Sequence, residues 1–160
     1  MPTYHLGASS QSKLAGVHPD LVRVVERAIQ LTPQDFAVVD GVRSMAQQRQ
    51  YVASGASHTL LSRHLTGHAV DLVPYVNNQA RWETPLLCKI AEAMRAAARE
   101  LNVPLRWGGC WDESLTASDA PTEEMVQAYQ KRRAAAGLHA FIDAPHFELP
   151  IKQYPAPNPE

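Results

Sequence analysis

The sequence has little of several features that would identify whole classes of protein. It contains only two cysteines, Cys88 and Cys110. Two cysteines 22 positions apart form neither a disulfide framework nor a thiolate zinc site, so we interpret both as free thiols. The charges nearly cancel, with 15 Lys and Arg against 16 Asp and Glu. Because no overall positive field would hold a polyanion, the composition argues against nucleic acid as a partner.

Long hydrophobic runs are also missing. No stretch approaches the roughly 18 consecutive apolar residues of a transmembrane helix, so we expect no membrane insertion. The first residues show no basic region followed by an apolar one, and this predicts that there is no signal peptide. If the protein acts outside the cytoplasm, we expect a separate factor to release it.

The chain does contain enough apolar material for one core. It has 160 residues, of which 45% are hydrophobic and 19% charged, which suits a single domain. We predict that this domain spans residues 1–152 and that residues 153–160, which include three prolines, form an extended tail. Nothing in the sequence calls for more than a monomer.

Hydrophobic periodicity and turn residues predict alternating helices and strands. The expected helices cover residues 19–31, about 44–52, 85–101 and 121–135. The expected strands cover residues 36–39, 68–73, 105–107 and 146–149, with Pro74 ending the second of them. This order fits a parallel α/β sheet or an α+β fold with an antiparallel sheet, and periodicity alone does not decide between the two.

Two pairs of histidine and aspartate carry the chemistry. His64 and Asp71 are seven residues apart, and Gly67 between them can turn the chain so that both side chains point to one place. Asp143 and His146 form a second pair near the other end of the chain. Two histidines and one aspartate with an open fourth position make up the ligand set of a hydrolytic zinc site. A nearby carboxylate, for which Asp143 is the candidate, would move the protons.

The motif SxHxxGxAxD at residues 62–71, together with Asp143-x-x-His146, resembles the LAS-type zinc peptidases of peptidoglycan. That family includes D-alanyl-D-alanine carboxypeptidases, dipeptidases and L-alanyl-D-glutamate endopeptidases. Residues 16–21, residues 40–44 together with Gln47, and residues 106–109 are similar to the phage-endolysin branch of the last group. The resemblance covers most of the chain and implies an α+β fold, in which helices flank a small central antiparallel sheet and the zinc site lies on one sheet face.

The resemblance also implies roles for individual residues. It implies that Zn²⁺ is held by His64, Asp71 and His146, and that Asp143 is the general base and acid. A fixed cation would stabilise the negative charge that develops on the scissile carbonyl oxygen, and Arg43 matches the arginine of the family that does so.

Three further positions carry predictions with open alternatives. Ser62 contacts substrate or merely caps a turn, and Gln47 matches the family as a substrate-binding residue. Arg43 has the alternative role of a surface salt bridge. Glu148 shares a strand face with His146, where it either orients the imidazole or is an exposed charge. In many relatives the turn between the two tryptophans reads WGGDW, and here Cys110 replaces the aspartate, which puts any role of that carboxylate in doubt.

Taken together, the motifs predict a zinc-dependent peptidoglycan endopeptidase, a phage endolysin that cuts the L-alanyl-D-glutamate bond of the stem peptide. A D-alanyl-D-alanine carboxypeptidase with the same site is an alternative, because pocket walls set the scissile bond. A noncatalytic zinc-containing module that binds the cell wall is a second one. We expect the protein to be made in the host cytoplasm and to act in the periplasm after holin-type release.

Overall fold

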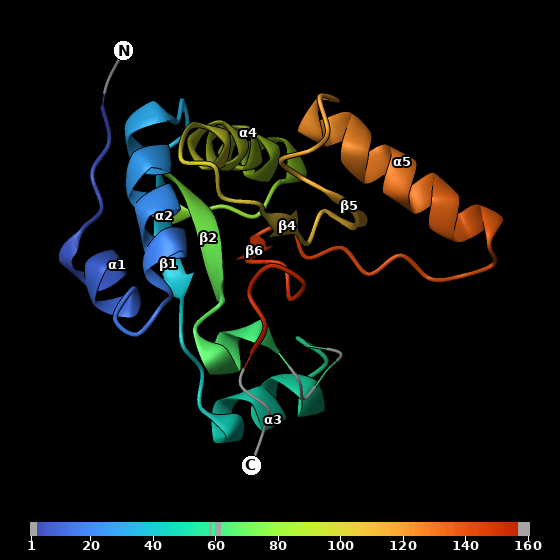
Figure 1. The fold of residues 1–160 in the computed structure, drawn as a ribbon, viewed down its shortest axis with the longest axis horizontal. Coiled ribbons are helices and arrows are strands. Elements are labelled where there is room, and N and C mark those ends of the chain that lie inside the picture. The colour runs from blue at the N-terminus through green and yellow to red at the C-terminus, as the bar shows by residue number, and fades with distance from the viewer. Residues whose placement is uncertain (1–2, 58, 60–61, 157–160) are drawn as a thin grey trace.

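In the computed structural model, which describes residues 3–57, 59 and 62–156, helices surround a small antiparallel sheet (Figure 1). The helices are α1 (Ala8–Lys13), α2 (Pro19–Leu31), α3 (Met45–Ala53), α4 (Thr84–Glu100) and α5 (Thr122–Ala135), with a 3-10 turn η1 (Arg63–Thr66). The strands are β1 (Phe36–Asp40), β2 (Ala69–Val76), β3 (Gln79–Ala80), β4 (Arg106–Trp107), β5 (Cys110–Ser114) and β6 (His146–Glu148). The predicted α+β class is confirmed, and the parallel alternative is wrong.

The sheet has the order β1-β2-β6-β4-β5, and every pairing in it is antiparallel. The long strand β2 lies between β1 and β6, and β3 forms a hairpin with the end of β2. Helices α2 and α4 pack against each other beside β2 (Figure 1). Val70 and Leu72 of β2 are fully buried in the core that these helices form. The alternate residues of β2 face the other side of the sheet, where Asp71 lies.

Helix α2 has the bounds that the sequence predicts. Pro19 occupies its first turn, where a missing N–H costs nothing, and the His18 ring accepts a hydrogen bond from the backbone N–H of Asp20. Leu21 and Val24 are completely buried, and each such side chain stabilises the fold by about 1.5–3 kcal/mol. An N-cap and one apolar stripe together account for this helix.

The expectation that Pro74 ends its strand is wrong, because β2 continues to Val76. The N–H of Tyr75 donates to Asp35 beside β1. Backbone groups alternate sides along a strand, so the nitrogen of Pro74 faces the opposite edge. On that edge the pairing with β6 stops at Asp71. The carbonyl oxygen of Pro74 accepts a hydrogen bond from the N–H of Arg81, next to β3, so the strand stays paired there although Pro74 has no N–H to donate.

The structure also contains elements that the sequence did not predict, namely α1, η1, β3 and β5. The predicted tail overlaps a turn at 151–154, in which the N–H of Tyr154 donates to the carbonyl oxygen of Pro150. The last four residues of the predicted tail, 157–160, lie outside the described part of the chain. Cys88 and Cys110 are free, as predicted, and both are buried.

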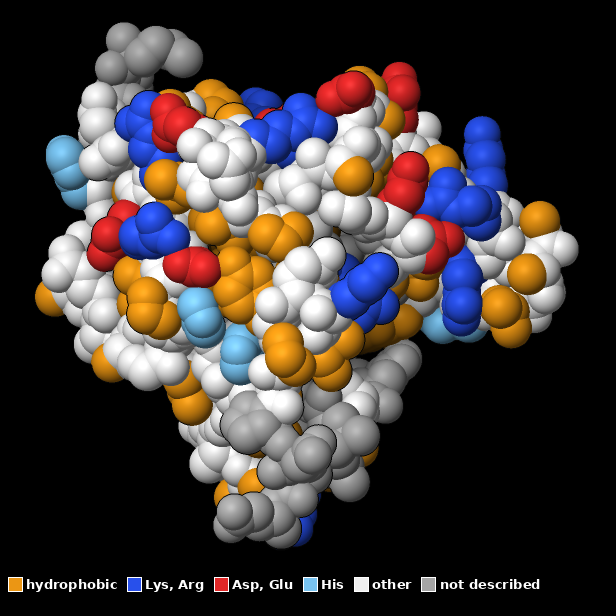
Figure 2. Space-filling model, in the orientation of Figure 1, with side chains coloured by type: hydrophobic (Ala, Val, Ile, Leu, Met, Phe, Trp, Pro, Cys, Tyr) orange, Lys and Arg blue, Asp and Glu red, His pale blue; other side chains and the backbone are white. Residues whose placement is uncertain are grey.

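Charges of both signs are interspersed over the face shown in Figure 2. Every helix in the described ranges is too short or too polar to cross a lipid bilayer.

Candidate active site

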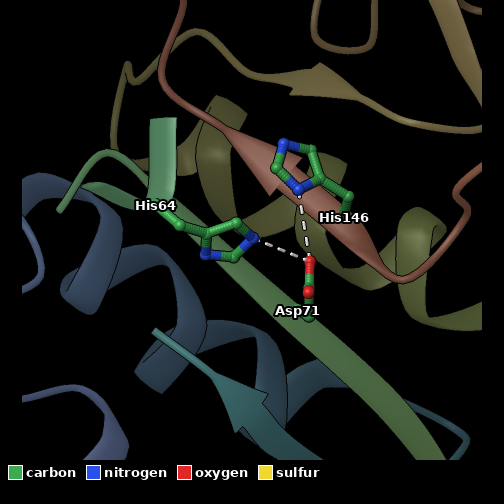
Figure 3. Close-up of side chains that lie close together, drawn as sticks. All are labelled: His64, Asp71 and His146. Carbon is green, nitrogen blue, oxygen red and sulfur yellow. Dashed lines mark hydrogen bonds and ion pairs between the residues drawn. The ribbon is translucent and has the colours of Figure 1, made fainter. Parts of the chain in front are cut away.

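His64, Asp71 and His146 converge on one point (Figure 3). The Oδ1 atom of Asp71 lies 3.1 Å from Nε2 of His64 and 3.2 Å from Nδ1 of His146. Asp71 and His146 are directly opposite each other on β2 and β6, so their side chains share one face of the sheet. The structure thus brings together the three residues that the sequence predicted as metal ligands.

His64 reaches this point because the chain turns just before β2. Ser62 begins the 3-10 turn by accepting a hydrogen bond from the N–H of His64, and Gly67 ends it in the left-handed conformation with φ 76°. A Cβ atom on Gly67 would lie 2.4 Å from the carbonyl oxygen of Gly16. Only glycine can adopt this positive φ without strain and also allow the close approach of the Gly16 carbonyl oxygen. The turn predicted at Gly67 is therefore present.

Two acceptors outside the cluster fix the orientation of the imidazoles. Nδ1 of His64 lies 2.7 Å from the carbonyl oxygen of Gly41, which can only accept, so Nε2 is left with a free lone pair. Nε2 of His146 lies 2.8 Å from Oε1 of Glu148, so Nδ1 faces Asp71. Glu148 is buried. Of the two alternatives, the structure supports the one in which Glu148 orients the imidazole.

The electrostatics of the cluster favour a cation. Burial alone would raise the pKa of Asp71, but hydrogen bonds with His146 and His64 hold it well below the usual value. Burial alone would lower the pKa of His146, but the hydrogen bonds to Asp71 and Glu148 raise it to about 10. Burial, reinforced by the negative charge of Asp71, raises the pKa of the Asp143 carboxyl. Three carboxylates around two imidazoles thus attract positive charge.

The donor set fits a zinc ion. Two ligands at the zinc–nitrogen distance of 2.0–2.1 Å in a tetrahedral site are about 3.4 Å apart, close to the 3.1 and 3.2 Å between Asp71 and the two histidines. Two imidazole nitrogens and one carboxylate oxygen match catalytic zinc sites, which keep a fourth position open. The described residues contain no other group of three such side chains that could hold a metal.

A loop fastened by two tryptophans carries Asp143. The indole N–H of Trp107 donates to the carbonyl oxygen of Ala144 at 2.7 Å, and that of Trp111 donates to Phe141 at 3.0 Å. Gly108 exchanges backbone hydrogen bonds with Asp143 and His146. A Cβ on Gly108 would lie 2.1 Å from the Asp143 carbonyl oxygen, so the close approach requires glycine.

Arg43 lies beside the cluster and is largely buried, so the alternative of a surface salt bridge does not describe it. Its Nη2 donates to Oδ2 of Asp71 at 2.8 Å, and its Nε donates to Asp40 at 2.5 Å. Its Nη1 donates to Gln48 at 3.1 Å, and its guanidinium stacks 4.3 Å above the ring of Tyr51. Each of the two Nη atoms has a second N–H group, which these hydrogen bonds do not use.

The two neighbouring glutamines have different roles. Gln47, predicted to bind substrate, forms a capping box with Ser44 at the start of α3 and does not line the cleft. Gln48 is completely buried and links Arg43 to Ser57 and to the backbone of Thr59. The sequence did not predict a role for Gln48, because its contacts with Arg43 and with the backbone of Thr59 come from the fold.

The cluster lies at the bottom of a cleft of about 640 Å³. Ser62, Asp143 and Glu148 are part of its wall, so Ser62 both caps η1 and reaches the cleft. Aromatic side chains contribute to the lining, namely Tyr51, Trp82, Trp111 and Phe141. A cleft of this size and composition suits a peptide with polar groups.

The family described as phage L-alanyl-D-glutamate peptidase matches residues 2–150. An L-alanyl-D-glutamate peptidase of Escherichia phage T5 is 36% identical over 116 residues, which is 70% of this chain and 85% of that protein. The crystal structure of the Serratia marcescens L-Ala D-Glu endopeptidase ChiX matches with a TM-score of 0.73 and 39% identity over 95% of both chains. These matches confirm the resemblance seen in the motifs, and the chain belongs to the family of phage L-alanyl-D-glutamate peptidases.

Proposed function

We propose that the protein is a zinc-dependent peptidoglycan endopeptidase that hydrolyses the L-alanyl-D-glutamate bond of the stem peptide. The observation that carries this proposal is the convergence of His64, Asp71 and His146 beside Asp143 at the bottom of the cleft. The names of the two relatives support the bond, because both refer to L-alanine and D-glutamate. The three converging residues would hold the ion.

When bound, zinc supplies a Lewis acid that lowers the pKa of water to about 7, so that a nucleophile is present at neutral pH. Asp143 accepts the proton of the attacking water and passes it to the leaving amine of D-glutamate. Its carboxylate makes no hydrogen bond to any residue in the described ranges, and its raised pKa favours holding a proton between the two transfers.

Arg43 and Ser62 bind the reacting peptide. The second N–H group on each Nη atom of Arg43 stabilises the carbonyl oxygen of L-alanine as it becomes negative. Asp40, Gln48 and Asp71 hold the guanidinium in place before substrate arrives, so little reorganisation is needed. Ser62, at the cleft wall, presents its hydroxyl to the peptide. We assign no substrate contact to Gln47.

The proposal is tested by the lysis of outer-membrane-permeabilised Gram-negative cells and by analysis of the muropeptides released. Native protein, chelator-treated protein, the same protein with zinc restored, and Asp143→Asn are compared. We expect zinc to restore lysis and Asp143→Asn to lower the rate by about 10²–10⁴-fold with its zinc content unchanged. The products should be free stem peptides, with L-alanine left on the sugar.

The two alternatives predict different results. Release of free D-alanine would show a D-alanyl-D-alanine carboxypeptidase. Binding of zinc and of sacculi without any cleavage would show a cell-wall binding module. We further propose that the enzyme acts as a monomer in the periplasm, reached from the host cytoplasm by holin-type release, and that it serves as a phage endolysin.

A further inference from the structure

Three arginines line the described part of the cleft, and two of them are already engaged. The Arg43 side chain, 10% exposed, is held by the three partners described above. Arg63 is buried and donates to the backbone oxygens of Leu149 and Tyr154. The Arg106 side chain, by contrast, is 46% exposed. Arg106 is thus the cleft arginine that an incoming ligand can reach.

The guanidinium of Arg106 is held in place from one side. Its Nε donates to the carbonyl oxygen of Trp111 at 3.0 Å, and its central carbon lies 5.0 Å from the centre of the Trp111 ring. Its Nη1 lies 3.6 Å from Oε2 of Glu148, which is an attraction between charges but too long for a hydrogen bond. Within the described ranges neither Nη atom makes a hydrogen bond. Both therefore remain available as donors to a ligand.

Arg106 is also close to the proposed metal site. Glu148, which attracts it through Oε2, contacts the His146 ring through Oε1. The ring of Trp111, on which the guanidinium lies, is 5.2 Å from the ring of His146. One layer of side chains thus separates a solvent-accessible cation from the proposed metal site.

The proposed substrate has a negative group that a cation one side-chain layer from the metal site could bind. D-glutamate has two carboxyl groups, and when one continues the peptide the other stays free. Its two carboxyl carbons lie within a few bonds of the scissile nitrogen. A free carboxylate there would be repelled by Asp71, Asp143 and Glu148 unless a positive group faced it. Arginine suits this task, because its planar fork can bind both carboxylate oxygens at once.

We propose that Arg106 binds the free carboxylate of the D-glutamate residue that supplies the leaving amine, and so makes the enzyme selective for D-glutamate over its carboxamide. This inference rests on the proposed function and adds a specificity-determining residue to it. Trp111 supports the guanidinium from below, and Glu148 aligns it without occupying its two Nη atoms.

The test uses two matched peptides, L-alanyl-D-glutamyl peptide with the free carboxylate and the same peptide with that group as a carboxamide. The ratio of kcat/KM for the two peptides is measured for native zinc-loaded protein, R106Q, R106K and R27Q. Arg27 is the matched control, because it is a partly exposed arginine paired with Glu100 and does not line the cleft. For variants too slow to assay, calorimetry on their inactive D143N versions measures the ratio of the binding constants of the two peptides, which reports the part of the preference that is present in the bound ground state.

We expect native protein and R27Q to prefer the carboxylate peptide about tenfold or more, R106K to keep part of this preference and R106Q to lose it. R106Q should lose rate on the carboxylate peptide only. Equal rates of native protein on both peptides would overturn the inference and leave the proposed function standing. A preference that R106Q retains would overturn it too. If native protein cleaves neither peptide, the proposed function itself fails.

Discussion

At the scale of single residues, the site depends on which nitrogen of each imidazole is left free. The Gly41 carbonyl oxygen takes the Nδ1–H of His64, and the Glu148 carboxylate takes the Nε2–H of His146. The two histidines therefore present different atoms, Nε2 and Nδ1, to the same point beside Asp71. Such outer partners fix ring orientation and raise the basicity of a ligand.

Removing the charge of Glu148 should weaken metal binding without unfolding the protein. For E148Q we expect zinc affinity to fall by about 10–100-fold, because the glutamine can still contact the ring of His146 but no longer polarises it. Competition with a chromogenic chelator measures this affinity. E100Q is the control, since Glu100 pairs with Arg27 outside the cleft. An E148Q protein with native zinc affinity would show that Glu148 only fills space.

Residue identity was predictable from the sequence where a local motif specified it. The motif around His64 and the spacing of Asp143 and His146 singled out the side chains that the structure brings together. Gln48 was missed because its importance comes from contacts with Arg43 and with the backbone of Thr59, which no local pattern reveals.

At the scale of elements, the C-terminal turn at 151–154 is fastened beside the residue that precedes His64. Arg63 donates to the carbonyl oxygens of Leu149 and Tyr154. The hydroxyl of Tyr154 donates to the carboxylate of Asp20 at 2.7 Å, near the start of α2. The turn thus connects the first turn of α2 to η1, and it supports the position of His64.

The Tyr154–Asp20 bond should make the stability of the fold depend on pH at both extremes. The hydrogen bond from Tyr154, followed by that from Arg23, lowers the pKa of Asp20 in the folded state. The ionised Asp20 carboxylate therefore contributes to the free energy of unfolding above its unfolded pKa of about 3.9, and this contribution is lost as pH falls through the pKa that Asp20 has in the folded state. Burial and the bond to Asp20 raise the pKa of Tyr154 to about 12. This second contribution is complete below about pH 10 and is lost as pH rises toward 12.

For Y154F we expect a loss of about 1 kcal/mol in unfolding free energy between about pH 5 and 9. The difference from native protein should shrink at pH 3 and again near pH 12. Urea unfolding at several pH values measures it. Y4F is the control, because the Tyr4 side chain is also partly buried against the core and its hydroxyl makes no hydrogen bond within the described part of the chain. A difference that stays constant with pH would show that the bond contributes nothing.

Elements were predictable where capping and periodicity agreed, as in α2. β5 was missed because its exposed residues Asp112 and Glu113 give no alternating pattern, and its pairing with β4 defines it. The continuation of β2 through Pro74 depends on its pairing with β1 and β3, which the sequence pattern of β2 does not show. Arg63 holds the C-terminal turn through hydrogen bonds to Leu149 and Tyr154, which lie 86 and 91 positions further along the chain. Sequence periodicity carries no information at such separations.

At the scale of the whole molecule, the proposed ligands join segments that are far apart in the chain. His64 comes from η1, Asp71 from the central strand β2, and His146 from β6 near the C-terminal end. Asp143 and Glu148 add negative charge to the same region. Without a cation, these carboxylates are held close together at an electrostatic cost, so a bound metal ion would neutralise the cluster and connect the three segments.

Metal removal should therefore lower the stability of the whole fold as well as abolish activity. A ligand that binds only the folded state stabilises it by about 2.7 kcal/mol at a free concentration 100 times its Kd, which for a chain of this size raises Tm by about 5–10 °C. Thermal unfolding of chelator-treated protein, with and without added zinc, measures this shift. D143A should keep it, because Asp143 is not a proposed ligand, whereas H64A should lose it. If zinc raised the Tm of H64A as much as that of native protein, the ion would bind elsewhere, and the assignment of His64 as a ligand would have to be abandoned.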